Sequence, residues 1–176
     1  DWPLKFQSKP VRLLVVMDPI ASITPEKDSS FAMMLEAQRR GWFITVAELD
    51  DLSIRDGRAW GRLTEMRVTD RPDDWYQVGD VTVRPLDEMD VILMRKDPPF
   101  DNEYIYSTYI LEAAERKGTL VVNRCQSLRD CNEKVFATQF PQCCPPVLVS
   151  ADMSRLKAFH RQHEDTIFKP LDGMGG

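Results

Sequence analysis

The sequence predicts an α/β protein built on an open, mainly parallel sheet. Residues 11–17 and 91–95 are short apolar runs of the kind that form parallel strands covered on both faces. Each run is followed by a helical pattern and then by another strand-like run, so the order strand, helix, strand occurs twice. Open parallel sheets are built from such βαβ units, and we expect right-handed crossovers in both.

The first of these units begins with the strand over residues 11–17. A polar loop follows, and Ser29 or Ser30 is expected to cap a helix because apolar side chains recur behind them at helical spacing. Gly41 comes directly after a basic pair and is expected to end this helix. The second strand of the unit is expected over residues 42–49.

The middle of the chain is less regular. Residues 53–63 contain Asp56-Gly57 between two short runs, which favours a hairpin with a tight turn. Residues 81–83 read Val-Thr-Val and predict a further strand.

The second βαβ unit starts with the strand over residues 91–95, which Asp97-Pro98-Pro99 brings to an end. A helix is expected over residues 103–117, with Gly118 closing it. Residues 119–123 supply the next strand. The helix side chains expected to share one face are Tyr106, Ile110, Ala113 and Ala114.

Beyond this unit the pattern changes. Ser127 with Asp130 three residues later is a variant of the capping box and predicts a helix that runs through Phe140. Residues 141–146 form a loop with three prolines. A short strand is expected over residues 147–149.

The last predicted elements are a helix over residues 152–163 and a strand over residues 166–169. We place a domain boundary near Asn123. The chain then consists of a first α/β domain in residues 1–122 and the beginning of a second domain in residues 123–176.

The charge balance argues against nucleic acid as a partner. Lys and Arg number 23 and Asp and Glu number 28, so the formal net charge is −5, the wrong sign for binding polyanions through basic charge. No run approaches the roughly 20 apolar residues of a membrane helix, and residues 1–10 lack the apolar core of a secretion signal. We expect a cytoplasmic protein that binds neither nucleic acid nor membrane.

The glycine-rich end of the chain is a candidate phosphate site. Lys169 precedes Gly173, Gly175 and Gly176, and the NH groups of such a turn can close around phosphate oxygens beside an ammonium group. Because the lysine comes before the glycines, this is not the P-loop order, and the sequence does not contain the dinucleotide pattern Gly-x-Gly-x-x-Gly. From the residues alone, the segment is either a phosphate site of another architecture or a plain turn.

A second candidate site lies where two parallel strands are expected to end. Asp18 follows the first strand, and Arg95, Lys96 and Asp97 follow the strand that begins at residue 91. Open α/β sheets bind ligands at this edge. The alternative is that Asp18 caps a turn and that the two basic residues only mark where a strand reaches the surface.

Other groups favour structural explanations. His160 and His163 lie at i and i+3 of one expected helix, but no third metal ligand follows at suitable spacing, which favours a solvated helix face. Ser29 and Ser30 are interpreted as helix caps rather than nucleophiles. The cysteines lack paired C-x-x-C spacing and are interpreted as reduced thiols. They are Cys125, Cys131, Cys143 and Cys144.

Several segments, in the same order along the chain, carry a specific family resemblance. They are Met17 to Ile20, Lys27 to Met33, Leu35 to Gly41, Ile92 to Asp101, Ser127 to Lys134 and Lys169 to Gly176. Over about residues 11–176 the chain resembles bacterial-type glutathione synthetase, a member of the ATP-grasp superfamily.

This resemblance implies a Rossmann-like N-terminal α/β domain, called pre-ATP-grasp, followed by the start of an α+β ATP-grasp domain. It implies that ATP phosphorylates the cysteinyl carboxylate of γ-glutamylcysteine, and that the amine of glycine attacks the acyl phosphate. The products are glutathione, ADP and phosphate. ATP and Mg²⁺ are the implied cofactors, and a homo-oligomer is the implied assembly.

The resemblance also implies residue roles on the nucleotide side. Lys169 is similar to the strand lysine that contacts nucleotide phosphates in the family, and Gly173, Gly175 and Gly176 begin the loop that covers them. The family usually has Asn-Lys-Pro where this chain has Asn-Arg-Cys, so Arg124 replaces the other nucleotide-contacting lysine. A planar guanidinium does not have the shape of an ammonium, which leaves the role of Arg124 open.

On the peptide-substrate side, the matching segments contain Asp18, Arg95, Lys96 and Asp97. No catalytic residue is assigned. We expect the chain to be a fragment that is inactive alone, with the Mg²⁺ ligands downstream of Gly176. The alternatives are an ATP-grasp ligase for another acid and amine, and a non-enzymatic module that binds a nucleotide or small ligand.

Overall fold

The computed structural model describes residues 9–71 and 73–173. The strands are β1 (Arg12–Val16), β2 (Phe43–Ala47), β3 (Leu52–Arg55), β4 (Arg58–Val68), β5 (Tyr76–Pro85), β6 (Val91–Met94) and β7 (Leu120–Val122). The α-helices are α1 (Ser29–Arg39), α2 (Asn102–Glu115), α3 (Cys125–Asp130), α4 (Glu133–Phe136) and α5 (Met153–Gln162).

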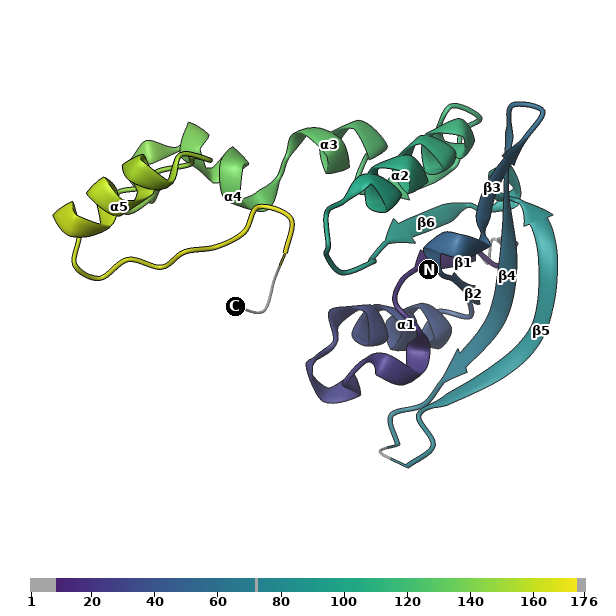
Figure 1. The fold of residues 1–176 in the computed structure, drawn as a ribbon. Helices are drawn as coiled ribbons and strands as arrows, with labels where there is room; N and C mark the ends of the chain where they lie inside the picture. The colour runs from purple at the N-terminus through teal and green to yellow at the C-terminus, as the bar shows by residue number, and fades with distance from the viewer. Residues whose placement is uncertain (1–8, 72, 174–176) are drawn as a thin grey trace, which may run out of the picture.

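All seven strands belong to one sheet in the order β3-β4-β2-β1-β6-β7, with β5 paired to β4 (Figure 1). The four strands β2, β1, β6 and β7 are parallel, and β3, β4 and β5 are joined to each other and to β2 in antiparallel fashion. Val15 of β1 lies opposite Val46 of β2 and Leu93 of β6. The predicted fold class is confirmed, and β1 and β6 end side by side at one edge.

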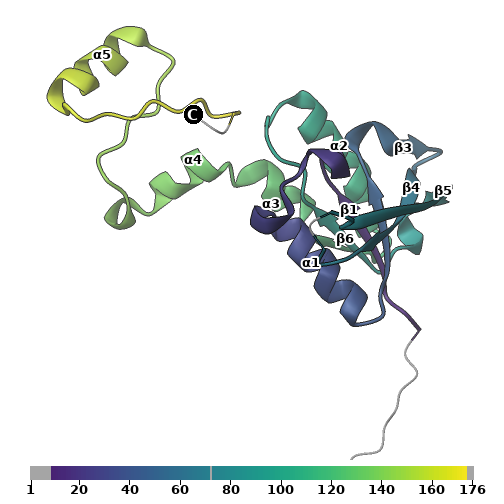
Figure 2. The same ribbon diagram turned by 90° about the horizontal axis from the view of Figure 1, so that it is seen from below.

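The two faces of the sheet are covered by different helices. Leu14 and Val16 belong to the core cluster that packs against α2, whereas Leu13 and Val15 belong to the cluster under α1. The helices accordingly lie on opposite sides of β1 (Figures 1 and 2). Burial on both faces explains why the strand is apolar at successive positions.

The first helix begins one residue earlier than the predicted caps allow. The carboxylate of Asp28 accepts a hydrogen bond from the backbone N–H of Phe31 at 2.8 Å, so Asp28 is the N-cap. Ser29 and Ser30 therefore lie inside the helix, and the prediction that one of them is the cap is wrong. Gly41 has φ +75°, a conformation that favours glycine, and follows the end of the helix as predicted.

The predicted hairpin is present between β3 and β4. Asp56 and Gly57 both have positive φ, 50° and 72°, as a tight two-residue hairpin turn requires. The strand predicted at residues 81–83 is the centre of the longer β5.

The buried face of α2 differs in part from the face the sequence predicts. Ala114 is buried, but Tyr106 is 58% exposed, and Ile110 and Ala113 are half-buried. Two hydroxyl residues occupy buried positions because each donates to a backbone carbonyl of its own helix, which satisfies the polar atom. The fully buried residues are Ser107, Thr108, Leu111 and Ala114.

The continuous helix predicted from Ser127 to Phe140 is wrong. The chain forms α3, breaks at Cys131, and starts again as α4 with Asn132 as its N-cap. The side-chain oxygen of Asn132 accepts hydrogen bonds from the backbone N–H groups of Lys134 and Val135 at 3.0 and 3.2 Å. Capping by this side chain competes with continuation of the helix.

The last part of the described chain extends away from the sheet through α3, α4 and α5, and residues 171–173 turn back toward it (Figure 1). The predicted helix near residues 152–163 is confirmed as α5. The strands predicted at residues 147–149 and 166–169 are not formed, because no strand of the described residues lies beside either segment. Ile167 is 82% exposed.

Candidate functional site

The carboxyl ends of β1 and β6 bring three of the predicted site residues together. The carboxylate of Asp18 pairs with the ammonium of Lys96 at 2.9 Å and accepts a hydrogen bond from the backbone N–H of Asp97 at 3.0 Å. The Lys96 ammonium also donates to the backbone carbonyl of Asp97 at 2.7 Å. Asp18 thus orients Lys96 and closes the loop after β6 onto the loop after β1.

Arg95 points to another part of the same edge. Its guanidinium Nε donates to the hydroxyl of Ser30 at 3.0 Å, and its backbone N–H donates to the carbonyl of Val16 at 2.7 Å. Ser30 lies in the first turn of α1 and is buried. Within the described chain, Arg95 shares no side-chain hydrogen bond or ion pair with Asp18, Lys96 or Asp97.

Residues 171–173 return to this edge from the far end of the described chain. The backbone N–H of Phe100, in the connection between β6 and α2, donates to the carbonyl of Asp172 at 2.7 Å. The side-chain amide of Asn132 donates to the carbonyl of Leu171 at 2.9 Å, and the Lys134 ammonium donates to the carbonyl of Gly173 at 2.7 Å. The segment is thus held from two sides.

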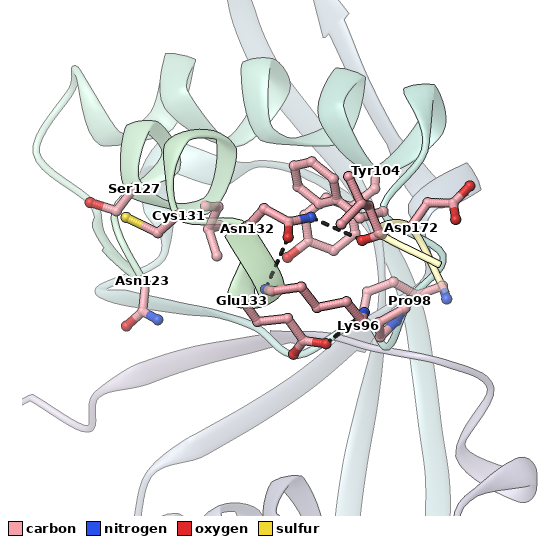
Figure 3. Close-up of a pocket in the computed structure, with 13 residues that line it drawn as sticks. Lys96, Pro98, Tyr104, Asn123, Ser127, Cys131, Asn132, Glu133 and Asp172 are labelled. Atoms are coloured by element: carbon pink, nitrogen blue, oxygen red, sulfur yellow. Dashed lines mark hydrogen bonds and ion pairs between the residues drawn. The ribbon is translucent and has the colours of Figure 1, made fainter. Parts of the chain in front are cut away.

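A pocket of about 340 Å³ lies between the β6–α2 connection and the start of α4 (Figure 3). Lys96, Phe100 and Tyr104 line it from the first side, and Asn132, Lys134 and Asp172 line it from the second. The side chains of Lys96 and Lys134 are only 19% and 17% exposed. Burial raises the pKa of the Tyr104 hydroxyl, so this group stays a neutral hydrogen-bond donor. The pocket lining thus combines two ammonium groups, both already engaged in protein contacts, with a hydroxyl and the acidic residues Glu133 and Asp172.

Of the predicted nucleotide-side residues that the structure describes, Gly173 is the one bound by a residue lining this pocket. Gly173 contributes the carbonyl that Lys134 binds, and a Cβ added to it would lie 3.2 Å from Cγ of Pro170. Lys169 and Arg124 are both exposed and neither is among the pocket residues of the described chain. Gly175 and Gly176 lie outside the described residues.

Arg129 fastens α3 to α2 beside the pocket. Its guanidinium donates to the carboxylate of Glu112 at 2.8 Å and to the hydroxyl of Thr108 at 3.0 Å, and it stacks 4.7 Å from the ring centre of Tyr109. The Arg129 and Glu112 side chains are 12% and 18% exposed. The hydrogen bond from Arg129 lowers the pKa of Glu112.

Comparison with known proteins identifies the family. The model of the prokaryotic glutathione synthetase N-terminal domain matches residues 11–129, and the model of the ATP-grasp domain of the same enzymes matches residues 133–176. The chain belongs to the prokaryotic glutathione synthetase family. The resemblance that the sequence segments carry is confirmed.

Individual relatives give the same assignment. Glutathione synthetases from Pseudomonas aeruginosa, Photorhabdus laumondii and Yersinia pestis are 58%, 55% and 55% identical over 166 residues. Each alignment covers 94% of this chain and 52% of the relative. The chain therefore spans about half the length of the curated glutathione synthetases it matches. The predicted boundary near Asn123 stays a prediction.

The sequence did not lead us to predict Asn132 and Lys134 as residues that line this pocket. Both residues lie in the segment from Ser127 to Lys134 that carries the family resemblance, but the pattern there predicts one continuous helix. The available signal was Asn132 itself, because asparagine is among the best N-cap residues and so marks a new helix start.

The described residues contain no group of three or more His, Cys, Asp or Glu side chains that could hold a metal ion. The ring of His160 packs against Phe168, and that of His163 packs against Phe159. The cysteine thiols are free, and burial raises the pKa of Cys125 to about 12. Among the helices of the described ranges, none has the length and apolar character needed to cross a membrane.

Proposed function

We propose that the complete protein is a glutathione synthetase that joins γ-glutamylcysteine to glycine at the expense of ATP. Family membership supports this function. The observation in the fold that supports it best is the contact between the Phe100 N–H and the Asp172 carbonyl. This contact joins the proposed peptide side of the site to the segment that leads into the proposed phosphate side.

The reaction requires such a junction. A carboxylate is a poor electrophile until one of its oxygens is converted into a leaving group, which ATP supplies by transferring its γ-phosphoryl group. The amine of glycine then forms the C–N bond while the C–O bond to phosphate breaks. Because no covalent bond to the protein forms, catalysis depends on alignment of the substrates and on stabilising their charge.

On the peptide side, we assign substrate binding to Asp18, Arg95, Lys96 and Asp97. Arg95 can bind a substrate carboxylate through two parallel hydrogen bonds, because its Nε is already fixed by Ser30 and the guanidinium is oriented. Lys96 can contribute charge to the pocket, and its ion pair with Asp18 holds it in place. Asp18 and Asp97 act in this proposal by orienting Lys96.

On the nucleotide side, we assign phosphate contacts to Lys169, Gly173, Gly175 and Gly176, and a second cationic contact to Arg124. The exposure of Lys169 and Arg124 fits groups that meet a ligand rather than the core. A Cβ at Gly173 would lie close to the ring of Pro170, so a side chain there would crowd the backbone that we assign to phosphate contacts. We propose Mg²⁺ as the metal, with ligands in the part of the family's length that this chain does not span.

Two further properties stay predictions: a homo-oligomer, which the resemblance implies, and a cytoplasmic location, which we expect from the amino-acid sequence. A polypeptide limited to residues 1–176 is expected to release no phosphate, because about half of each relative's length lies outside the alignment. Phosphate release by that polypeptide that depends on γ-glutamylcysteine and glycine would contradict this expectation.

The function is tested by steady-state turnover of the complete protein. Phosphate release should require γ-glutamylcysteine, glycine and Mg²⁺ together. Lys169→Met should lower kcat/KM for ATP by about 100-fold or more, because it removes a charge from the phosphate site, whereas Lys157→Met on the exposed face of α5 should not. Nucleotide binding without turnover would instead indicate a binding module, and turnover only with another acid and amine would indicate a different ligase.

A further inference from the structure

The segment of residues 171–173 is held by two side chains to which the proposed function assigns no role. Asn132 and Lys134 lie at the start of α4, and each reaches a backbone carbonyl 39 positions further along the chain. Both contacts are made to backbone carbonyls, so they do not depend on which side chains the segment carries. Figure 3 shows Asn132 pointing toward the segment that carries Asp172.

Asn132 makes two kinds of contact with the two ends of one amide. Its oxygen accepts hydrogen bonds from the N–H groups of Lys134 and Val135 and so caps α4. Its nitrogen donates to the carbonyl of Leu171 at 2.9 Å. A carboxylate at this position could do the first but not the second, since an ionised carboxylate only accepts hydrogen bonds.

Lys134 contributes the charged contact. Its side chain is 17% exposed, its ammonium donates to the carbonyl of Gly173 at 2.7 Å, and it pairs with the Glu133 carboxylate at 3.0 Å. Glu133 is 70% exposed, so solvent screens this ion pair more than the contact with Gly173. A hydrogen bond from an ammonium to a sheltered carbonyl is stronger than one between neutral groups.

We propose that Asn132 and Lys134 are positioning residues that dock residues 171–173 against the β6–α2 connection and thereby close the pocket. They hold Leu171 and Gly173 from one side, and the Phe100 N–H holds Asp172, the residue between them, from the other. The consequence for catalysis rests on the proposed function. In that function the docked segment sets the distance between the acid and the phosphoryl donor.

Docking is tested by hydrogen exchange at the backbone amide of Phe100 in the complete protein. Pro98 and Pro99 carry no N–H, so a short peptide around this position contains few other exchangeable amides. Asn132→Asp and Lys134→Met should each raise the exchange rate of Phe100 by about tenfold, the effect of losing roughly 1.4 kcal/mol. Lys157→Met should leave the exchange rate of Phe100 unchanged. Exchange at the amide of Val15, which is buried in the core, should be the same in every variant.

The choice of variants separates docking from local stability. Asn132→Asp preserves the cap on α4 because aspartate caps as well as asparagine does, and it removes only the amide donor. Asn132→Ala removes both. Lys134→Arg keeps a cationic donor and should restore much of the protection that Lys134→Met loses. Unchanged exchange of Phe100 in both Asn132→Asp and Lys134→Met would overturn the docking role.

The catalytic consequence has its own measurement. Lys134→Met should lower kcat about tenfold while leaving KM for γ-glutamylcysteine unchanged, because the proposed peptide-side residues belong to other elements, and Lys134→Arg should recover kcat. Faster exchange with unchanged kcat would overturn the link to catalysis. Should the complete protein lack ligase activity altogether, the proposed function fails, while the exchange result still decides whether the two residues position the segment.

Discussion

At the scale of single residues, Asp18 illustrates how one carboxylate organises the sheet edge. Both of its oxygens are used, one by the ammonium of Lys96 and the other by the backbone N–H of Asp97. Both partners lie beyond the end of β6, so hydrogen bonds between strands do not hold them in place. The carboxylate of Asp18 therefore binds the loop after β6, and the lysine that it orients lines the pocket.

This arrangement predicts the effect of truncating Asp18. Asp18→Ala leaves the Asp97 N–H without its acceptor and Lys96 without its counter-charge, and should lower the free energy of unfolding by about 1–2 kcal/mol, since the pair is partly exposed. Asp18→Asn keeps an acceptor and should cost less. Urea unfolding of the complete protein measures both; equal losses for the two variants would contradict the assigned backbone contact.

At the scale of elements, the packing of α2 determines which face of the helix contributes to the free energy of unfolding. Leu111 is fully buried, whereas Tyr106 is 58% exposed. Leu111→Ala should lower the free energy of unfolding by about 3 kcal/mol because it removes buried methyl groups and leaves a cavity. Tyr106→Ala, the matched change on the exposed face, should cost under about 1 kcal/mol. A larger loss for Tyr106→Ala, measured by urea unfolding, would mean that the helix is rotated relative to this structure.

The attachment of α3 to α2 predicts a dependence on pH. The hydrogen bond from Arg129 lowers the pKa of Glu112 in the folded protein relative to its ordinary value of 4.5. The pair therefore stabilises the fold fully above the ordinary pKa, and this stabilisation is lost as the pH falls through the lowered one. Arg129→Met should reduce the loss of stability between neutral and acidic pH.

The measurement for this pair is the free energy of unfolding as a function of pH, with and without Arg129→Met. Glu112 keeps a second partner in Arg116 at 2.7 Å, so the variant should weaken the pH dependence rather than remove it. Lys157→Met serves as the control for loss of an exposed cation. Identical pH profiles for Arg129→Met and the unaltered protein would contradict the role assigned to the pair.

At the scale of the whole molecule, the parts predicted well are those whose signal is local. β1, β2 and β6 follow from continuous apolar runs, and the turn at Asp56 and Gly57 follows from its dipeptide. The strand predicted over residues 166–169 failed because strand formation requires a neighbour, which the described chain does not place there. The continuous helix predicted from Ser127 was wrong because Asn132 caps a new helix, and its side chain is a stronger start signal than the capping-box variant at Ser127.

Only one part of the candidate site, the residues at the carboxyl ends of β1 and β6, could be predicted from the sequence. The position of Asp18, Lys96 and Asp97 at one edge follows from the rule for parallel strands, and the structure brings these three together. The return of residues 171–173 to that edge depends on contacts across 39 positions from Asn132 and Lys134, which no periodicity records. The pocket between the β6–α2 connection and the start of α4 therefore could not be predicted, because it forms only when these distant segments pack together.

Activation of a carboxylate as an acyl phosphate is the central step of the proposed reaction, and isotope transfer tests this step most directly. γ-Glutamylcysteine labelled with ¹⁸O in its cysteinyl carboxylate is incubated with the complete protein, ATP, Mg²⁺ and glycine, and the released phosphate is analysed by mass spectrometry. We predict one labelled oxygen in each phosphate, because the oxygen that bridges carbon and phosphorus leaves with the phosphoryl group. Phosphate released without label would contradict it.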